Sequence, residues 1–254
     1  MAGEEPLQNR GPPLLAGGTS TVTPLRICTY NVHKCKGMDW RVSPARIAKV
    51  MAHLRADIVA TQEILLSQAA EISERIEVPF TFGCARQHGV EPYGNAVFSR
   101  MPILSQRSYH LTVRGREQRQ CLRVSFQLAS GNTVHFFAVH LGTSFVERRE
   151  QARMLLSREI LLCDETRSQR IIAGDFNEWT RGLATRMLTQ HFESADIVMH
   201  LRRRRTYPGI LPFMHLDHVY YDPEFKLREM HLHRTRLALV ASDHLPLIAT
   251  FSET

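Results

Sequence analysis

A series of short apolar segments, each of strand length and many of them ending in polar residues, most restricts the fold of this chain. The segments are LRICTYNV from Leu25, then DIVATQEI, GNAVFSR, CLRVSFQL, NTVHFFAVHL, RIIAGDFN, LDHVYY, FKLREMHLH and LPLIATF. Runs of this length that are rich in β-branched and aromatic residues predict strands with buried faces. A chain with this many strands must pair them in sheets and cover the apolar faces.

Helical patterns stand between several of these segments. Apolar residues recur at helical spacing in PARIAKVMAHLRA, where Ser43 and Pro44 supply an N-cap and a first-turn proline. Further helices are expected over about 67–76, in an amphipathic segment from about 145 to 165, and over about 184–190. The cluster at 130–132, Ser-Gly-Asn, predicts a hairpin turn. We therefore predict an α/β (α+β) fold with two mixed β-sheets packed face to face and helices outside.

We expect a single domain over residues 25–254, preceded by a flexible tail over residues 1–24. The tail is rich in Pro, Gly, Ser and Thr and lacks the pattern of a signal peptide. Five scattered cysteines, none in CxxC spacing, argue against a disulfide framework or a zinc cluster and favour the reducing cytoplasm. No segment approaches the roughly 18 apolar residues that span a bilayer, which argues against a membrane-spanning protein. A monomer is expected.

The charge balance favours partners that carry phosphate. The formal net charge of +7 and a pI near 9.5 would draw the chain toward nucleic acid, anionic lipid or phosphorylated metabolites. The balance does not choose among these partners. Many enzymes are basic without any such partner, so the charge is weighed only together with the residues described next.

The polar residues at the ends of the apolar segments form a chemically consistent set. A strand end holds its side chain rigidly, although a single Asp or Asn in such a place is more often a turn former or a helix cap. The hard oxygen donors of the set suit magnesium, with manganese as the alternative ion, and its histidines can donate hydrogen bonds to phosphoryl oxygens. These residues are Asn31, Glu63, His140, Asp175, Asn177, Asp217, Asp243 and His244.

The blocks TYNVH, ATQE, YGNAVFSR, AVHL, GDFN, LDHVY and SDHLP follow one another from about Arg26 to Phe251. In this order they resemble the signature blocks of the endonuclease/exonuclease/phosphatase superfamily of deoxyribonuclease-like, metal-dependent phosphoesterases. The superfamily includes pancreatic-type deoxyribonucleases, abasic-site endonucleases, deadenylases, inositol polyphosphate 5-phosphatases and neutral sphingomyelinases. The resemblance implies their shared four-layer αββα sandwich. In length and in its RTYP…LPFMHLDHVY block, the chain is most similar to compact bacterial members.

The resemblance also implies how the metal ion and the attacking water are held. Glu63 would be the principal metal ligand, with Asn31 beside it and Asp243 near the metal. Asp175 would position or deprotonate the attacking water. Asn177 would hydrogen-bond the phosphoryl group as negative charge builds up.

The remaining blocks are expected to act on the phosphate. His244 would contact the scissile phosphate, paired with Asp217. His140 would be a second phosphate-side group or the acid that assists the leaving group. Asn95 is expected to face the substrate in a supporting network. No covalent intermediate is needed for in-line attack of water on phosphorus.

A run of arginines precedes Tyr207 in a segment where the superfamily places substrate-facing loops. Arg203, Arg204 and Arg205 are predicted to clamp a phosphate backbone, against the alternative of a solvated basic loop. Tyr207 is predicted to face the substrate, with local packing as its alternative. In the helix after AVHL, Arg149 or Gln151 could point toward the site, although an exposed charged face is the simpler interpretation.

We therefore predict a magnesium-dependent phosphodiester hydrolase with nucleic acid as its substrate, that is, an endonuclease or exonuclease. The alternative is a phospholipid or inositol-phosphate phosphoesterase of the same superfamily. A remote third reading, a non-catalytic phosphate-binding module, predicts a broken set of site residues, and the set is complete. The other histidines, His215 and His218 among them, lack the spacing of metal ligands and are expected to be structural or at the surface.

Overall fold

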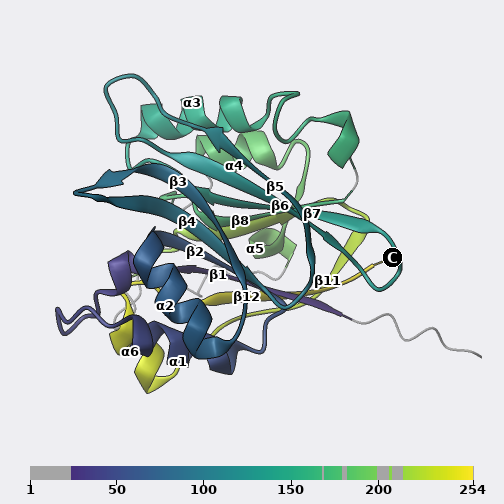
Figure 1. Cartoon of the computed structure of the whole chain (residues 1–254). Coiled ribbons are helices and arrows are strands. Elements are labelled where there is room, and N and C mark those ends of the chain that lie inside the picture. Colours follow the sequence, from purple (N-terminus) through teal and green to yellow (C-terminus); the bar gives the residue numbers. More distant parts are fainter. Residues whose placement is uncertain (1–23, 168, 179–181, 199–205, 208–213, 254) are drawn as a thin grey trace, which may run out of the picture.

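Two six-stranded sheets pack face to face in the computed structural model, which describes residues 24–167, 169–178, 182–198, 206–207 and 214–253 (Figure 1). Within the first sheet, parallel pairing joins β1 to β2, and the other neighbours are antiparallel. Its order is β11 (Phe225–Leu232), β12 (Leu247–Glu253), β1 (Leu25–Asn31), β2 (Ile58–Leu65), β4 (Glu91–Ser99), β3 (Phe80–His88).

The second sheet repeats this arrangement with one parallel pair at its centre, β7 and β8, and antiparallel pairing elsewhere. Both sheets are therefore mixed, as the sequence predicted. The order of the second sheet is β5 (Ile103–His110), β6 (Gln120–Gln127), β7 (Thr133–His140), β8 (Arg170–Asp175), β10 (Asp217–Tyr221), β9 (Glu193–Ser194).

Helices cover the outer face of each sheet, which completes the four layers. In Figure 1, α1 (Pro44–Leu54), α2 (Leu66–Ile76) and α6 (Arg236–Ala241) lie below the first sheet. On the other side, α3 (Phe145–Leu155) and α4 (Leu183–Leu188) lie above the second sheet. Three short helices lie in connections: η1 (His33–Cys35), η2 (Asp164–Thr166) and α5 (Ala195–Val198).

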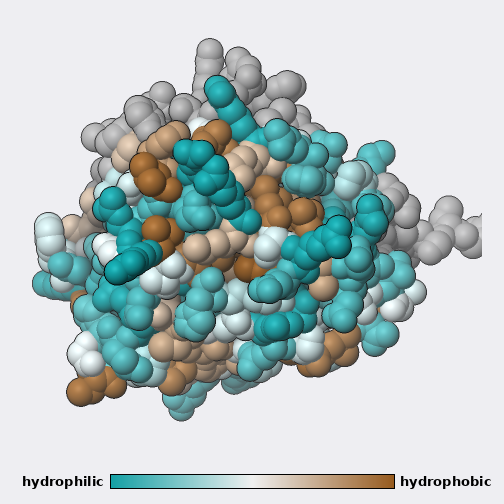
Figure 2. All heavy atoms as spheres, turned by 90° about the horizontal axis from the view of Figure 1, so that it is seen from above, coloured by the Kyte–Doolittle hydropathy of each residue, from teal (hydrophilic) through white to brown (hydrophobic). Residues whose placement is uncertain are grey.

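The apolar core has three parts that correspond to the spaces between these layers. Side chains of both sheets, such as Ile27 and Phe136, form the central part. A second part joins the first sheet to α1, α2 and α6, and a third joins the second sheet to α3 and α4. Figure 2 shows the outside of the α3 layer, where hydrophilic side chains alternate with small apolar groups. This separation of apolar inside from mixed outside is what amphipathic layers require.

Local sequence signals set several boundaries. The N-cap predicted at Ser43 is present, because its Oγ accepts a hydrogen bond from the Arg46 N–H at 3.2 Å. The predicted hairpin turn joins β6 to β7, with Gly131 at a φ of 91°. The first strand begins at Leu25 as predicted, while residues 1–23 of the predicted tail lie outside the described residues.

Several strands and helices differ from the sequence-based expectation, and α5 and α6 were not predicted. The apolar pattern did not predict β3, β5 and β9, each of which lies at an edge of its sheet. An edge strand has a neighbour on one side only, and most residues of β5 are exposed, so no apolar pattern marks it. The amphipathic segment expected from 145 to 165 is helical only to Leu155 in α3, and turns lead from there to η2.

Among the described residues, helices of the length and apolar character needed to cross a membrane are absent.

Candidate active site

The predicted site residues meet where several central strands of the two sheets begin or end, because these strands run in directions that bring those ends together. Asn31 is the last residue of β1, and His140 and Asp175 are the last residues of the parallel strands β7 and β8. The antiparallel strand β10 begins at the same edge with Asp217, whose Cα is in register with Asp175. His140 is also in register with Asp175. Parallel strands that end together therefore bring side chains from distant segments to one place.

Two of the predicted residues depend on an unusual backbone conformation. Glu63 has a φ of 55° and lies where the β2–β4 pairing shifts register between Thr61 and Ile64. Such an irregularity redirects a side chain that a regular strand would aim elsewhere. Asn177 has a φ of 50° directly after β8. Left-handed conformations at residues other than glycine are uncommon, and they are concentrated at functional sites.

A cavity of about 380 Å³ opens where these residues converge. Both sheets contribute to its wall, with Glu63 from β2 and His140 and Asp175 from β7 and β8. Asn31 and Asp217 do not line it but hold residues that do, as described below. The predicted residues that line the cavity are Glu63, His140, Asp175, Asn177, Tyr207, Asp243 and His244.

The Asn31 amide connects the two acidic centres of the site. Its Nδ2 donates to Glu63 Oε1 at 3.1 Å and to Asp175 Oδ2 at 2.9 Å. Its Oδ1 accepts a hydrogen bond from the His33 N–H at 3.0 Å, which fixes the orientation of the amide. Asn31 is almost fully buried, so these contacts exclude water. The amide therefore sets the separation between the two carboxylates.

The Asp175 carboxylate is buried and held at both oxygens. Oδ1 accepts from the Asn177 N–H at 2.8 Å, while Oδ2 accepts from Asn31. Burial raises the pKa of Asp175 to about 6, although the nearby His244 acts to lower it. At neutral pH this carboxylate is ionised, and its basicity is higher than that of an exposed aspartate.

His244 and Asp217 form a buried pair beside that carboxylate. His244 Nδ1 lies 2.8 Å from Asp217 Oδ2, and its Nε2 lies 3.6 Å from Asp175 Oδ2. Burial alone would lower the pKa of His244, but Asp217 and Asp175 outweigh it and raise the pKa to about 10. The imidazole is therefore charged at neutral pH, with Nδ1–H donated to Asp217 and Nε2–H directed toward the cavity.

His140, unlike His244, is uncharged at neutral pH. The Arg119 guanidinium lies 3.1 Å from His140 Nδ1, and because a guanidinium can only donate, Nδ1 accepts this hydrogen bond. The proton of a neutral ring then lies on Nε2, which is 3.8 Å from Glu63 Oε1 and 3.9 Å from Asp175 Oδ2. Burial and the Arg119 charge lower the pKa of His140 to about 3. His140 is thus a neutral hydrogen-bond donor.

The oxygen donors at the cavity fit a hard divalent cation. Glu63 and Asp243 present carboxylates to the same cavity and retain some solvent access, with side chains 22% and 21% exposed. Burial works against ionisation of Glu63, but His140, which is protonated in acid, the Asn31 hydrogen bond and Lys34 lower its pKa to about 2. Ionised carboxylates with an adjacent amide are the donor set that magnesium or manganese prefers. These residues could hold such an ion.

The structure also shows site residues that the sequence did not indicate. Arg119 and Arg148 line the cavity, and Lys34 Nζ lies 3.6 Å from Glu63 Oε2. In the helix after AVHL, Arg148 is the arginine that reaches the cavity, whereas Arg149 is exposed and Gln151 is buried under the loop, accepting from the Gly142 N–H. Lone arginines without a motif carry no signal that separates them from surface charge.

The residues that were predicted to contact the substrate do not all lie at the cavity. The Tyr207 ring lines the cavity, with its centroid 4.9 Å from that of His244. Asn95 does not line it; the Asn95 amide faces the carbonyls of Gln120 and Ala138 at 3.5 Å and so connects β4 to the other sheet. A substrate contact for Asn95 therefore stays a prediction. The predicted clamp residues Arg203, Arg204 and Arg205 lie outside the described residues.

Comparisons with known proteins agree with this fold. Residues 28–244 match the model of the Endonuclease/Exonuclease/phosphatase family. An endonuclease/exonuclease/phosphatase from Beutenbergia cavernae DSM 12333 shares 22% identity at a TM-score of 0.71, over 91% of this chain and 72% of that chain. A comparison with curated protein sequences gives no match.

Two further solved structures have the same fold. A mannosyl-6-phosphatase from Bacteroides thetaiotaomicron VPI-5482 has a TM-score of 0.76 and 18% identity, over 89% of this chain and 99% of that one. D. rerio TDP2, solved with a single-strand DNA product, has a TM-score of 0.70 and 17% identity, over 91% and 99%. At such identities the likeness shows a shared fold. Because the family model covers most of the sequence, this chain belongs to the Endonuclease/Exonuclease/phosphatase family of phosphoester-hydrolysing enzymes, which generally use divalent metal ions.

Proposed function

We propose that this chain is a magnesium-dependent phosphodiester hydrolase that acts on nucleic acid as an endonuclease or exonuclease. The observation that carries the proposal is the arrangement around Asp175. This buried carboxylate lies 3.6 Å from the charged imidazole of His244 and 2.9 Å from the Asn31 amide that also holds Glu63. A basic carboxylate, a charged donor and a cation site within one cavity are the groups that phosphate ester hydrolysis requires.

In this proposal Glu63 and Asp243 would hold the magnesium ion from the cavity, and Asn31, behind them, would help to orient it through its hydrogen bond to Glu63. When bound, the ion would neutralise charge on the phosphoryl oxygens as a Lewis acid. The Asn31 amide already fixes Glu63 relative to Asp175, so the cation site and the base keep a defined separation. Manganese, which takes the same oxygen donors, is the alternative ion.

Asp175 then positions a water molecule and accepts its proton. Its pKa of about 6 keeps the carboxylate ionised at neutral pH while making it a stronger base than an exposed aspartate. The Asn177 N–H and the Asn31 amide hold its two oxygens, so the carboxylate cannot rotate freely. The Asn177 side chain donates to the Leu141 carbonyl at 2.9 Å and lies at the cavity wall, where its second amide N–H would be available to a phosphoryl oxygen.

The two histidines take different tasks because their charges differ. His244, charged and paired with Asp217, donates Nε2–H to a phosphoryl oxygen and stabilises the charge that develops there. His140, neutral, donates Nε2–H toward the same space without adding net charge. Arg119 and Arg148 add positive charge to the cavity wall, which favours an anionic substrate.

Nucleic acid is favoured as the substrate by charge and by one aromatic contact. The chain has a formal net charge of +7, which strengthens association with a polyanion. Tyr207 lies at the cavity beside His244, where a ring can stack on a base. Among the structural neighbours, TDP2 was solved with single-strand DNA, whereas another neighbour is a mannosyl-6-phosphatase. A phospholipid or inositol phosphate is therefore kept as the second candidate substrate, because the same cavity charges would bind its phosphate.

The reducing cytoplasm is kept as the proposed compartment. All five cysteines are free in the structure, and three of them, Cys28, Cys35 and Cys121, are buried. Buried free thiols suit a compartment in which cysteines stay reduced. The proposal treats the protein as a monomer.

The test is hydrolysis with added magnesium, in two stages. A bis-aryl phosphate is compared with a mono-aryl phosphate, with and without chelator, and then plasmid DNA, single strands, abasic duplex, RNA, sphingomyelin and inositol phosphates are compared. We expect magnesium-dependent cleavage of the diester and of nucleic acid. Turnover of the monoester, sphingomyelin or an inositol phosphate alone would replace nucleic acid with the second candidate. No turnover by the wild type with any substrate would contradict the proposal.

A further inference from the structure

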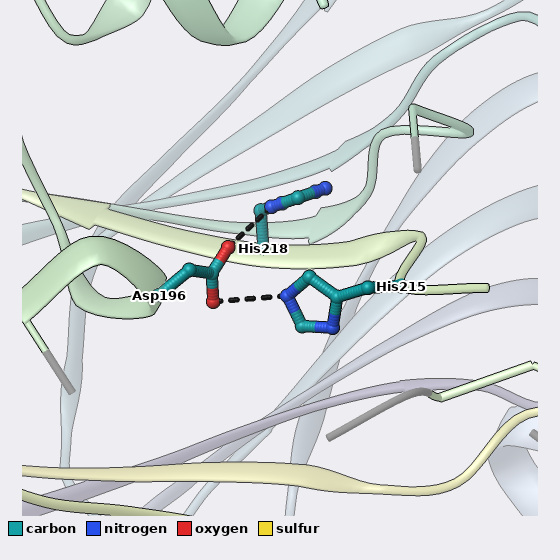
Figure 3. Close-up of side chains that lie close together, drawn as sticks. All are labelled: Asp196, His215 and His218. Atoms are coloured by element: carbon teal, nitrogen blue, oxygen red, sulfur yellow. Dashed lines mark hydrogen bonds and ion pairs between the residues drawn. The ribbon is translucent and has the colours of Figure 1, made fainter. Parts of the chain in front are cut away.

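A second cluster of potential ligand side chains lies behind the active site. Asp196 from α5, His215 from the segment just before β10 and His218 from β10 lie close together in Figure 3, where the Asp196 carboxylate faces both imidazoles. One ligand atom from each lies within 4.8 Å of the others. Adjacent residues of a strand point to opposite faces, so His218 lies on the far side of β10 from Asp217. The cluster is therefore separate from the cavity that Asp175 and His244 line.

His218 is oriented as a metal-binding histidine is. Its Nε2 lies 2.6 Å from the Glu178 carbonyl oxygen, which can only accept, so Nε2 carries a proton and donates it. Its Nδ1 faces Asp196 Oδ2. Histidines that bind metal typically donate their other ring N–H to a carbonyl or carboxylate, which fixes the tautomer and the ring. The Nδ1 atom is thus the one available to a ligand.

Three other atoms of the cluster are buried and make no hydrogen bond within the described part of the chain. They are Asp196 Oδ1 and both ring nitrogens of His215. His215 Nε2 lies 3.0 Å from Asp196 Oδ1, an ion-pair distance. Buried polar atoms are nearly always hydrogen-bonded or bound to an ion, because leaving them unpaired is costly.

A proton shared between His218 and Asp196 provides a hydrogen-bond partner for only some of the polar atoms in this cluster. Burial lowers the pKa of His218, but Asp196 outweighs it and raises the pKa to about 9, so one proton can be held between them. His215 Nε2 and Asp196 Oδ1 then face each other as an ion pair at 3.0 Å, and His215 Nδ1 has no hydrogen-bond partner among the described residues. A cation at the centre would take one lone pair from each of the three residues. Two imidazoles and one carboxylate form a donor set that zinc and similar divalent transition metals prefer over magnesium.

We propose that Asp196, His215 and His218 bind a divalent transition-metal ion of the zinc class, at a site distinct from the magnesium site of the catalytic cavity. The spacing of the two histidines did not indicate this, because their acidic partner Asp196 lies in another element. The ion would tie α5 to β10. Through the Glu178 carbonyl it would also hold the segment that follows Asp175 and carries Asn177. The role is structural support for the catalytic loop.

The test measures metal content on the untagged full-length protein. The protein is incubated with zinc chloride and dialysed, and bound zinc is counted by mass spectrometry. Cobalt(II) is then substituted, because its visible absorption reports histidine and carboxylate coordination. The variants are His215→Gln and Asp196→Asn. His110→Gln, at an exposed histidine, is the matched control, and Glu63→Gln removes a ligand of the catalytic cavity.

We expect one zinc ion per chain in the wild type, in His110→Gln and in Glu63→Gln, and its loss in His215→Gln and Asp196→Asn. Zinc should raise the thermal unfolding midpoint of the wild type and not that of His215→Gln. Absence of stoichiometric zinc and of a cobalt spectrum from the wild type would overturn the proposal, and the cluster would then hold a proton only. Zinc lost in Glu63→Gln but kept in His215→Gln would overturn it as well, because the ion would belong to the catalytic cavity. If the variants at Asp196 and His215 fail to fold, the amount of zinc bound by the wild type and by Glu63→Gln still tests the proposal.

Discussion

Asn31 Nδ2 donates a hydrogen bond to Asp175 Oδ2 at 2.9 Å, although the two residues are 144 positions apart and belong to different sheets. The same amide nitrogen reaches Glu63. One side chain therefore fixes the separation between the proposed metal ligand and the proposed base. This separation is a property of how the sheets pack, so changes at Asn31 should affect the reaction more than the fold.

We expect Asn31→Ala to lower kcat by about 10- to 100-fold, since a hydrogen bond to a charged group contributes about 1.5–3 kcal/mol. Steady-state kinetics at saturating magnesium measure this change. The thermal unfolding midpoint serves as the control, because a loss of folded protein would otherwise imitate a loss of catalysis. An unchanged kcat would show that the bridge does not organise the site.

Glu63→Gln and Asp175→Asn should each abolish measurable turnover while the protein stays folded. Both substitutions keep the shape of the side chain and remove its charge, so the cation site loses a ligand in one case and the water loses its base in the other. Circular dichroism should match the wild type. Either residue would lose its assigned role if its variant kept a rate near that of the wild type at saturating magnesium.

Asp217→Asn should reduce kcat by at least about 100-fold, because a catalytic histidine that loses its carboxylate partner loses its charge and its orientation. Asp217 is fully buried against His244 Nδ1. Asp222→Asn is the matched control, since Asp222 is also a buried aspartate but pairs with Arg170 at the opposite end of β8. The control should destabilise the fold and leave the kcat of the folded enzyme unchanged. Equal losses of kcat in both variants would assign the effect to stability.

Arg148→Gln should lower kcat/KM for an anionic substrate by about 10-fold or more, because a charge-assisted contact to phosphate would be lost. Arg148 lines the cavity and donates to the Thr143 carbonyl at 2.5 Å. Its neighbour Arg149 is exposed, so Arg149→Gln removes the same charge without changing the cavity. If both variants behaved alike, long-range attraction alone would explain the result.

The loop after η1 should lose part of its stability in acid. Asp39 accepts two hydrogen bonds from Arg46 at 2.8 Å, and this pairing lowers the pKa of Asp39 from 3.8 to about 2. Because the folded state holds the ionised form, the contribution is present above pH 3.8 and is lost as the pH falls through about 2. Asp39→Asn lacks this contribution, so the unfolding midpoints of wild type and variant should converge as the pH falls toward 2. The difference should be small because the pair is at the surface, and a constant difference down to that pH would contradict the assignment.

The sequence by itself determined the strand segments at the centre of each sheet and the polar residues that end them. The strands β1, β7 and β8 correspond to the segments LRICTYN, TVHFFAVH and RIIAGD. A buried strand needs a continuous run of mostly apolar residues, and such a run can be recognised in the sequence. Asn31, His140 and Asp175 come directly after those apolar residues. Parallel pairing of β7 with β8 places His140 and Asp175 at the same end of the second sheet, and the packing of the two sheets brings Asn31 to them.

Only the tertiary structure decided the features that depend on contacts between distant segments. Glu63 needs the irregular β2–β4 pairing to aim its carboxylate, and Arg119 becomes part of the site only because β6 lies beside β7. Asp196 lies close to His215 and His218 although it is distant from them in the sequence, and no known ligand spacing predicts this proximity. Local periodicity reports which face of an element is buried, whereas the identity of the neighbour depends on the packing of the whole chain, which no single segment encodes.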